Sequence, residues 1–185
     1  MSGIQEALGG VTMAPPDECW PILFEAERRS LGAIASHSFM HIEHFGSTAV
    51  PGLAAKPVID IMVAVERLEA LDEIEPALAS LGYKRLDVGF RKRRFYRKRE
   101  VGPGVAANLH FVTADRWPDK SERLFRDWLI EHPETARGYA ELKAALASRF
   151  PEDTVAYTAA KTEFIREIVN QARLARGFPP ETDWD

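Results

Sequence analysis

The sequence predicts an α/β (α+β) protein in which a small mixed β-sheet with flanking helices is followed by a helical C-terminal part. The order of strand and helix patterns predicts this fold class, and the length predicts a single domain. Strand patterns and helix patterns are mixed up to about residue 114, whereas residues 118–177 contain helix patterns only. The length of 185 residues suits one ordinary domain, since domains cluster at roughly 100–150 residues. A long doubly wound sheet would continue the alternation of strands and helices to its end.

The domain organisation follows from the same patterns. We expect a flexible leader over residues 1–13, a single domain over residues 14–177 and a tail over residues 178–185. Within the domain, the sheet part covers about residues 36–114 and the C-terminal helices cover about residues 118–177.

The elements of the sheet part come in a mixed order. Apolar residues at helical spacing predict a first helix in PPDECWPILFEAERRSLGAIAS. Alternation in SFMHIEHF and the β-branched residues of PVIDIMVAVE predict two strands. A helix that stops at Gly82 then precedes two further strands, over residues 93–98 and 106–113.

Three helices are predicted after the sheet. Their segments are PDKSERLFRDWLIEHP, ETARGYAELKAALASRF and EDTVAYTAAKTEFIREIVNQARLARGF, each with apolar residues on one face. Asp119, with Glu122 three residues later, is the expected N-cap of the first.

Composition excludes some classes of function. The net charge of −4 argues against non-specific attraction of the whole molecule to nucleic acid or anionic membranes. The single cysteine, Cys19, has no partner at zinc spacing, so we expect it to be buried and the protein to be cytoplasmic. The N-terminus lacks the regions of a signal peptide and no window suits a membrane span, so we expect no membrane partner.

A Gly-Ser pair directly follows the first predicted strand, in the stretch HIEHFGSTAVPGLAAKPVIDIMV. Such a turn presents backbone N–H groups and a hydroxyl to phosphate oxygens. Gly-Ser turns without a function are common, and it is the neighbouring residues that favour chemistry. Lys56 offers a positive charge to a phosphate, and Asp60 offers a carboxylate to a divalent cation.

The stretch HFGSTAVPGLAAKPVIDI strongly resembles the signature of the GrpB family (UPF0157), uncharacterised proteins assigned by fold to the nucleotidyltransferase superfamily. NLHFV, FRDWLIEHPETARGYAELKAALA and YTAAKTEFI also resemble the family, so the likeness covers about residues 17–175. Some members are fused to dephospho-CoA kinase. The resemblance implies a nucleotidyltransferase-like sheet in which Gly46 and Ser47, with Thr48, form the phosphate turn. Asp60 then matches the first carboxylate that binds Mg²⁺ or Mn²⁺.

The chain departs from the superfamily pattern at two positions. The Asp-x-Asp strand reads Asp60-Ile61-Met62, and a thioether does not replace a hard oxygen ligand of magnesium. The strand where a third carboxylate is expected presents His110, which is either a metal ligand or general base, or a buried structural histidine. Strand alternation places Glu43 near the Gly-Ser turn, as a further metal ligand or a solvated residue. The candidate metal ligands are therefore Asp60, Glu43 and His110, and the candidate catalytic residues are Asp60 and His110.

Basic residues crowd positions 91–99, around Phe95 and Tyr96. An edge strand protected by charge is one interpretation. The other is a phosphate-binding wall that includes Arg94, or a contact with RNA in which Tyr96 stacks on a base. Lys161 lies within the apolar stripe of the last helix, so it either extends to solvent or binds a carboxylate or phosphate.

The leading hypothesis is a nucleotidyltransferase-like protein that binds a nucleoside triphosphate or related phosphate ligand and transfers a nucleotidyl group to a small acceptor. The predicted phosphate-binding residues are Gly46, Ser47, Thr48, Lys56, Arg94 and Lys161. One alternative is a non-catalytic module that binds a nucleotide or coenzyme, which Met62 favours. Further alternatives are a phosphohydrolase or phosphotransferase that uses His110, and RNA binding. The sequence specifies neither the nucleotide, the acceptor nor the oligomeric state.

Overall fold

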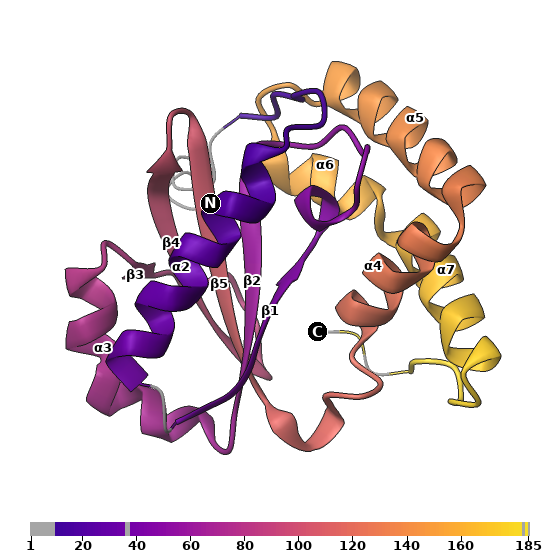
Figure 1. The fold of residues 1–185 in the computed structure, drawn as a ribbon. Coiled ribbons are helices and arrows are strands. Elements are labelled where there is room, and N and C mark those ends of the chain that lie inside the picture. Colours follow the sequence, from indigo (N-terminus) through magenta and orange to yellow (C-terminus); the bar gives the residue numbers. More distant parts are fainter. Residues whose placement is uncertain (1–9, 36–37, 183, 185) are drawn as a thin grey trace. The chain divides into compact units, whose positions relative to one another are not determined.

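Two units make up the part of the chain that the structure, a computed structural model, describes: residues 10–35, 38–182 and 184 (Figure 1). The sheet unit consists of Glu18–Ala49 and Val58–Pro118. The helical unit consists of Val50–Pro57, the residues from 119 onward and the described residues up to Asp17. The loop between the first two predicted strands therefore belongs with the C-terminal helices.

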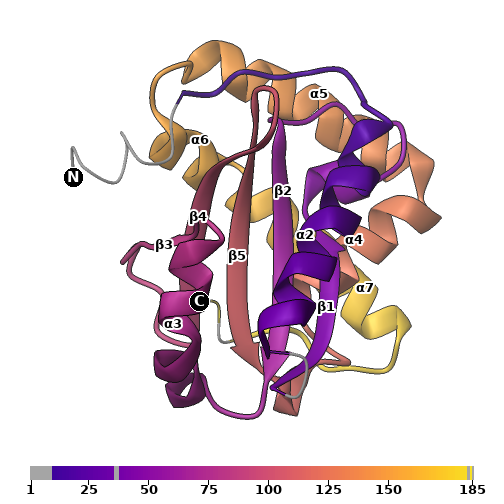
Figure 2. The ribbon, with the colours of Figure 1, turned by 60° about the vertical axis from the view of Figure 1, so that its left-hand side comes forward.

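The sheet unit is built on a five-stranded sheet with the order β1-β2-β5-β4-β3 (Figure 2). β2 (Val58–Val65) and β5 (Val105–Thr113) are parallel neighbours. β1 (Phe39–Phe45), β4 (Arg93–Gly102) and β3 (Lys84–Arg85) pair antiparallel. The predicted mixed sheet is confirmed. β3 was not predicted, because two residues are too few to show an alternating pattern.

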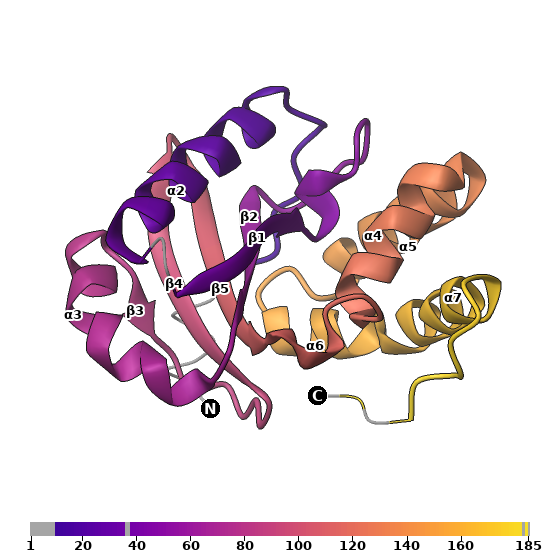
Figure 3. The ribbon, with the colours of Figure 1, turned by 60° about the horizontal axis from the view of Figure 1, so that its bottom comes forward.

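Two helices, α2 (Cys19–Ala35) and α3 (Leu71–Ser80), lie on the same face of this sheet (Figure 3). The ring of Phe24 on α2 stacks on that of His44 on β1, with 4.9 Å between centroids. Lys98 on β4 donates a hydrogen bond of 2.8 Å to the buried carboxylate of Glu27 on α2. We call this face of the sheet the helix face.

The opposite face, which we call the Asp60 face, follows from strand register. Phe45, Asp60, Asn108 and Arg97 are direct neighbours across β1, β2, β5 and β4. Side chains two residues apart on a strand share a face, so Met62 and His110, which also pair with each other, lie on the Asp60 face.

The helical unit contains α4 (Ser121–Glu131), α5 (Pro133–Arg149), α6 (Thr154–Ala160) and α7 (Thr162–Ala175). Its core includes Val50, Leu53, Leu129 and Tyr139, so apolar residues of the loop complete the packing of the helices. One long final helix was predicted, but the chain forms α6 and α7 with a break at Lys161. The backbone N–H of Lys161 donates a hydrogen bond of 3.2 Å to the carbonyl of Thr158, and this tight turn ends α6.

Some residues of the predicted leader and tail pack against the helical unit. Residues 1–9 of the predicted leader lie outside the described residues, but Val11 is buried and its amide donates to the carbonyl of Pro151 at 2.8 Å. Residues 183 and 185 of the tail also lie outside the described residues. Before them, buried Arg173 on α7 donates to the carbonyl of Pro179 at 2.6 Å. Val11 and Pro179, which lie in the predicted leader and tail, thus each take part in a contact of the helical unit.

Two smaller expectations are wrong. Cys19 is exposed, because it is the first residue of α2 and lies off the buried stripe that contains Trp20, Phe24 and Leu31. Asp119 does not cap α4; its carboxylate accepts a hydrogen bond of 3.0 Å from Arg173. Among the helices in the described ranges, none combines the length and apolar character needed to cross a membrane.

Candidate functional site

The turn after β1 meets the carboxylate of Asp60. Gly46 has φ +75°, a conformation that favours glycine. A Cβ atom at this position would collide with the Asp60 carboxylate, which lies on the strand next to β1, opposite Phe45. Glycine is therefore required for its backbone conformation and for the close approach. The structure brings the predicted turn and the predicted carboxylate together.

A chain of side-chain hydrogen bonds runs from Asp60 across three strands. Asn108 on β5 donates its Nδ2 to Asp60 Oδ1 at 2.8 Å. Its own Oδ1 accepts from the guanidinium of Arg97 on β4 at 2.6 Å. Burial lowers the pKa of Arg97, while the negative charge of Asp60 acts against this shift. Asn108 thus holds the half-buried carboxylate of Asp60 in place. Arg97, on the next strand, is near enough for its positive charge to interact with that carboxylate.

Buried hydrogen bonds hold the turn itself. The short helix η1 (Ser47–Ala49) follows Gly46. The hydroxyl of Thr48 donates to the carbonyl of Val58 at 2.8 Å, and its oxygen lies 3.0 Å from His44 Nε2. Because the only hydroxyl proton is directed at Val58, His44 donates to the Thr48 oxygen. Thr48, a predicted phosphate ligand, therefore has its buried hydroxyl engaged in fixing the turn.

The predicted metal ligands are not gathered into one set. Across the ranges that the structure describes, no group of three His, Cys, Asp or Glu side chains could hold a metal ion. Met62, at the position of the second carboxylate, is fully buried with Phe45 and Ala64 in an apolar cluster. Glu43 lies opposite Met62 on β1 and is half-buried. These donors do not fit a two-metal site, because a buried thioether replaces a carboxylate oxygen.

His110 lies in an aromatic environment on the Asp60 face. Its ring is 4.8 Å from that of Phe95 and 5.1 Å from that of Phe45, centroid to centroid. Burial lowers the pKa of His110 well below its ordinary value, and the charge of Arg93 adds to this effect. Its Nδ1 has no hydrogen-bond partner among the described residues. The imidazole is therefore neutral near pH 7, and its place beside Met62 favours the interpretation of a buried histidine.

The basic run is divided between the two faces of β4. On the helix face, Arg94 forms an ion pair with Asp72 of α3, and Lys98 pairs with Glu27. Arg93 and Arg97 lie on the Asp60 face by alternation. Arg94, the predicted phosphate ligand, thus lies on the opposite face from Asp60, and Arg97 is the arginine linked to that carboxylate.

The two predicted phosphate-binding lysines belong to the helical unit. Lys56 Nζ lies 3.3 Å from the hydroxyl of Thr154 at the start of α6. The ammonium of Lys161 lies over the ring of Tyr157, 4.2 Å from its centroid. A third lysine, Lys143 on α5, is buried and donates to the carbonyl of Ala54 at 2.6 Å.

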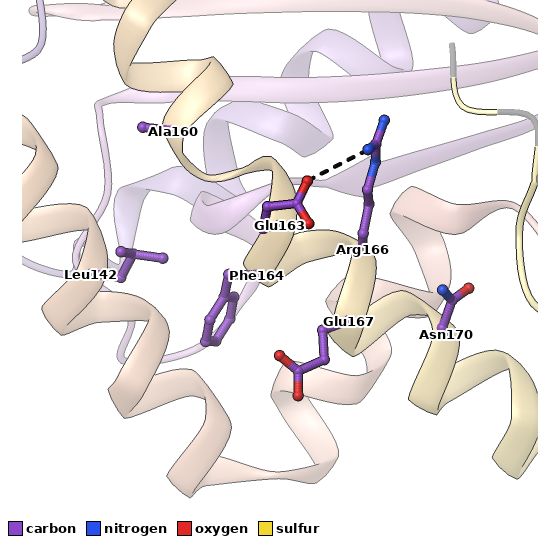
Figure 4. Close-up of a pocket in the computed structure, with 7 residues that line it drawn as sticks. All are labelled: Leu142, Ala160, Glu163, Phe164, Arg166, Glu167 and Asn170. Atoms are coloured by element: carbon purple, nitrogen blue, oxygen red, sulfur yellow. Dashed lines mark ion pairs between the residues drawn. The ribbon is translucent and has the colours of Figure 1, made fainter.

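An open hollow also lies in the helical unit, along the beginning of α7 (Figure 4). Glu163, Glu167 and Asn170 line it, and Glu163 is ion-paired with Arg166 at 3.5 Å. Its acidic lining makes it a poor site for a phosphate.

Sequence reasoning missed three residues of these arrangements: Asn108, Arg97 as distinct from its basic neighbours, and Lys143. Asn108 is the polar residue of the apolar strand AANLHFV, a signal that was available. Lys143 follows Tyr139 by four residues within a helical apolar stripe, which is also readable. The side of the sheet on which Arg97 lies depends on strand register and has no local signal.

The fold is of the mixed α/β class, and its sheet places a glycine turn against a single carboxylate. Comparison with known proteins identifies the family. The sequence profile described as GrpB protein matches residues 10–171. The chain belongs to the GrpB family.

Several relatives support this assignment. A UPF0157 protein of Pseudomonas aeruginosa is 37% identical over 175 residues, which cover 91% of this chain and 70% of that protein. The glutamate-rich protein GrpB of Alkalihalophilus pseudofirmus is 33% identical over 88% of this chain and 96% of its own. A dephospho-CoA kinase of Mycolicibacterium paratuberculosis is 32% identical over 93% of this chain, which spans only 48% of that enzyme.

A solved structure has the same fold. The crystal structure of the conserved protein GrpB from Enterococcus faecalis superposes with a TM-score of 0.78 and 33% identity, over 87% of this chain and 96% of that one. A cytoplasmic RNA terminal U-transferase matches with a TM-score of 0.41 and 12% identity, which is too weak to support an inference about this chain.

Proposed function

We propose that the protein binds a nucleoside triphosphate or a related phosphorylated small molecule at the turn formed by Gly46 and Ser47. The observation that carries this proposal is the contact of Gly46 with Asp60, whose carboxylate is tied through Asn108 to Arg97. A turn with a positive-φ glycine directs backbone N–H groups toward an anion. Arg97 lies on the same face and adds positive charge.

Asp60 places a negative charge beside the proposed phosphate site, which a simple anion site does not have. A carboxylate beside a phosphate repels it unless a cation or a proton donor lies between them. A ligand that offers both a phosphate and a hydroxyl satisfies the turn and the carboxylate together. Nucleotides have this chemistry, because the ribose hydroxyls and the phosphates belong to one molecule.

Nucleotidyl transfer is the second candidate function, and the fixed position of Asp60 favours it. In this reaction an acceptor hydroxyl oxygen bonds to the α-phosphorus, the bond to the pyrophosphate oxygen breaks, and Asp60 takes the hydroxyl proton. No step here requires the absent second carboxylate. Binding of one Mg²⁺ or Mn²⁺ by Asp60 stays a prediction, as does contact of RNA with residues 91–99.

Calorimetric titration of the full chain with ATP, GTP, CTP, UTP and coenzyme A, with and without Mn²⁺, tests the proposal. We expect one of these ligands to bind, and Arg97→Gln to weaken its binding by about tenfold to a hundredfold, since a charge-assisted contact contributes about 1.5–3 kcal/mol. Asp60→Asn should abolish transfer in a screen of hydroxyl acceptors while the variant still binds the phosphate.

Arg94→Gln is the matched control, because Arg94 lies on the same strand but on the helix face. Equal losses of affinity in the two arginine variants would contradict the proposed site. Metal-independent binding without turnover would support the hypothesis of a non-catalytic binding module and contradict nucleotidyl transfer. RNA binding predicts instead an affinity for single-stranded RNA that falls steeply with salt.

A further inference from the structure

Asp60 and Asn108 form a polar pair on β2 and β5, two inner strands of the sheet (Figure 2). Every other residue of β2 is buried, and in β5 only Asn108 and the final residue, Thr113, are partly exposed. The two residues of the pair are direct neighbours in the register of these strands. Carboxylate and amide side chains are seldom found within buried strands. The pair is therefore the place in the middle of these strands that a solute can reach.

The orientation of the Asn108 amide is fixed by its two neighbours. Arg97 has only donors, so the atom that accepts its hydrogen bond of 2.6 Å is Asn108 Oδ1. The other end of the amide, Nδ2, then faces Asp60 and donates to its Oδ1 at 2.8 Å. A rotated amide would set donor against donor and acceptor against acceptor. The bond from Arg97 thus ensures that Asp60 receives a hydrogen bond.

The two oxygens of Asp60 therefore have different surroundings. Oδ1 accepts from Asn108, whereas Oδ2 is the atom nearest to the position of a Cβ atom added at Gly46. Oδ2 thus faces the turn at which we propose that a phosphate binds. Each carboxylate oxygen has two lone pairs, so Oδ2 can accept a hydrogen bond from a ligand in addition to its contacts within the protein.

A ligand group that meets Oδ2 has to be a hydrogen-bond donor or a cation, because an ionised carboxylate only accepts. Across the described ranges, no three His, Cys, Asp or Glu side chains are grouped so that they could hold a metal ion. A hydroxyl is the donor that a nucleotide carries on its ribose, and carboxylates in dinucleotide-binding folds accept a hydrogen bond from this group. The arrangement around Asp60 therefore favours a ribose hydroxyl over a metal ion.

We propose that Asn108 is a positioning residue that orients Asp60 to accept a hydrogen bond from a ribose hydroxyl, so that the site selects ribonucleotides over deoxy analogues. This inference rests on the nucleotide binding proposed above and names the substrate class of the same site. Asn108 acts through the carboxylate that it orients and does not need to touch the ligand. Without its Nδ2, the carboxylate can rotate about its last bond, and Oδ2 no longer has one fixed direction.

Calorimetric titration of the full chain in the presence of EDTA tests this inference. The probes are ATP, GTP, CTP and UTP, each compared with its 2′,3′-dideoxy analogue. We expect the wild-type protein to bind the ribonucleotide about ten- to a hundredfold more tightly, since the analogue lacks a hydrogen bond to a charged group. Asn108→Ala should reduce this ratio to about threefold or less, with the affinity for the dideoxy analogue within about threefold of wild type.

Two further variants test whether Asn108 acts through Asp60. Asn108→Asp keeps an acceptor for Arg97 but replaces the donor to Asp60 with a second carboxylate, so it should lose the ratio as Asn108→Ala does. Asp60→Asn should also lose the ratio, and combining it with Asn108→Ala should cause no further loss, because the effects of coupled residues do not add. A purely structural role of Asn108 would lower both affinities equally and leave the ratio unchanged.

Asn170→Ala is the matched control. Asn170 is also a half-buried asparagine that bonds the protein, through its Oδ1 and the backbone N–H of Glu181, but it lies on α7 in the helical unit. Its replacement should leave the ratio unchanged. Circular dichroism checks that each variant keeps its sheet. If Asn108→Ala does not fold, Asn108→Asp decides, because aspartate has nearly the same shape as asparagine.

Three results would overturn the inference: equal affinity of the wild-type protein for a ribonucleotide and its dideoxy analogue, a wild-type ratio in Asn108→Ala, or a ratio that appears only with Mn²⁺. Nucleotide binding itself would stand in each of these cases. If none of the nucleotides binds, the inference fails, and titration with coenzyme A decides whether the proposed phosphate site fails as well.

Discussion

The sheet unit and the helical unit differ in which charged groups lie near each other. In the sheet unit, Asp60 and Arg97 are opposite charges connected through the amide of Asn108. In the helical unit, Lys143 and Lys161 are like charges, and the buried one has only a carbonyl and a ring as partners. In the sheet unit a cation is thus linked to a carboxylate through one amide, whereas in the helical unit buried Lys143 contacts a carbonyl and a ring and lies in the field of another cation, so burial disfavours its charged form.

The largest effect should come from the turn of the sheet unit. Gly46→Ala forces a Cβ atom into the Asp60 carboxylate and a side chain into positive φ. We expect the free energy of unfolding to fall by about 2–5 kcal/mol, of which roughly 1–2 come from the backbone conformation and roughly 1–3 from the collision. Urea denaturation of the variant and the wild-type protein measures this change in the free energy of unfolding.

Gly52→Ala is the control, because Gly52 has φ +74° and a Cβ atom added there would have no neighbour within 4 Å. It should lose only the conformational part, about 1–2 kcal/mol. If the two variants are equally destabilised, the contact between Gly46 and Asp60 does not constrain the turn.

The helical unit should show a stability that depends on pH through Lys143. Its pKa is about 7 in the folded protein and near 10.5 in the unfolded chain. Between these values the unfolded state binds the extra proton, so the free energy of unfolding rises with pH, by up to about 1.4 kcal/mol per unit.

Denaturation of the wild-type protein and of Lys143→Met from pH 7 to pH 9.5 measures this contribution. The difference between them should grow in favour of the wild-type protein as the pH rises. A difference that does not change with pH would mean that Lys143 keeps an ordinary pKa.

His110 should give a similar effect in the acid range. Burial lowers its pKa below the ordinary 6.5, so the unfolded chain binds a proton that the folded protein does not. The free energy of unfolding should therefore fall as the pH drops below about 6.5, by at most about 1.4 kcal/mol per unit. His110→Phe keeps the aromatic packing and should remove this slope. An unchanged acid slope in His110→Phe would assign it to other groups.

The smallest effect should come from the helix face. Arg94→Gln breaks the ion pair with Asp72, whose side chain is 63% exposed, so we expect a loss of at most about 1 kcal/mol. Thermal unfolding in low and high salt checks it, because screening should reduce the difference between variant and wild type. A loss of several kcal/mol would show that Arg94 has a role beyond this pair.

Much of the sheet unit was predictable. β1, β2, β4 and β5 were predicted because β-branched and aromatic residues alternate or cluster in them. The turn at Gly46 and the carboxylate at Asp60 were singled out from residue types and spacing. Which residue would lie beside Asp60 was not readable, because sliding β5 by two residues would place His110 there instead of Asn108.

The sequence by itself determined most of the elements, the family and the residue types that bear charge, since these depend on local pattern, but not the short strand β3 or the break between α6 and α7. Only the tertiary structure decided which charges meet. Strand register placed Arg97, and not Arg94, in the chain of hydrogen bonds to Asp60. Helix packing buried Lys143 against Ala54, 89 residues away in the sequence. Such pairings join distant segments, and their geometry is set by how whole elements pack and not by any local signal.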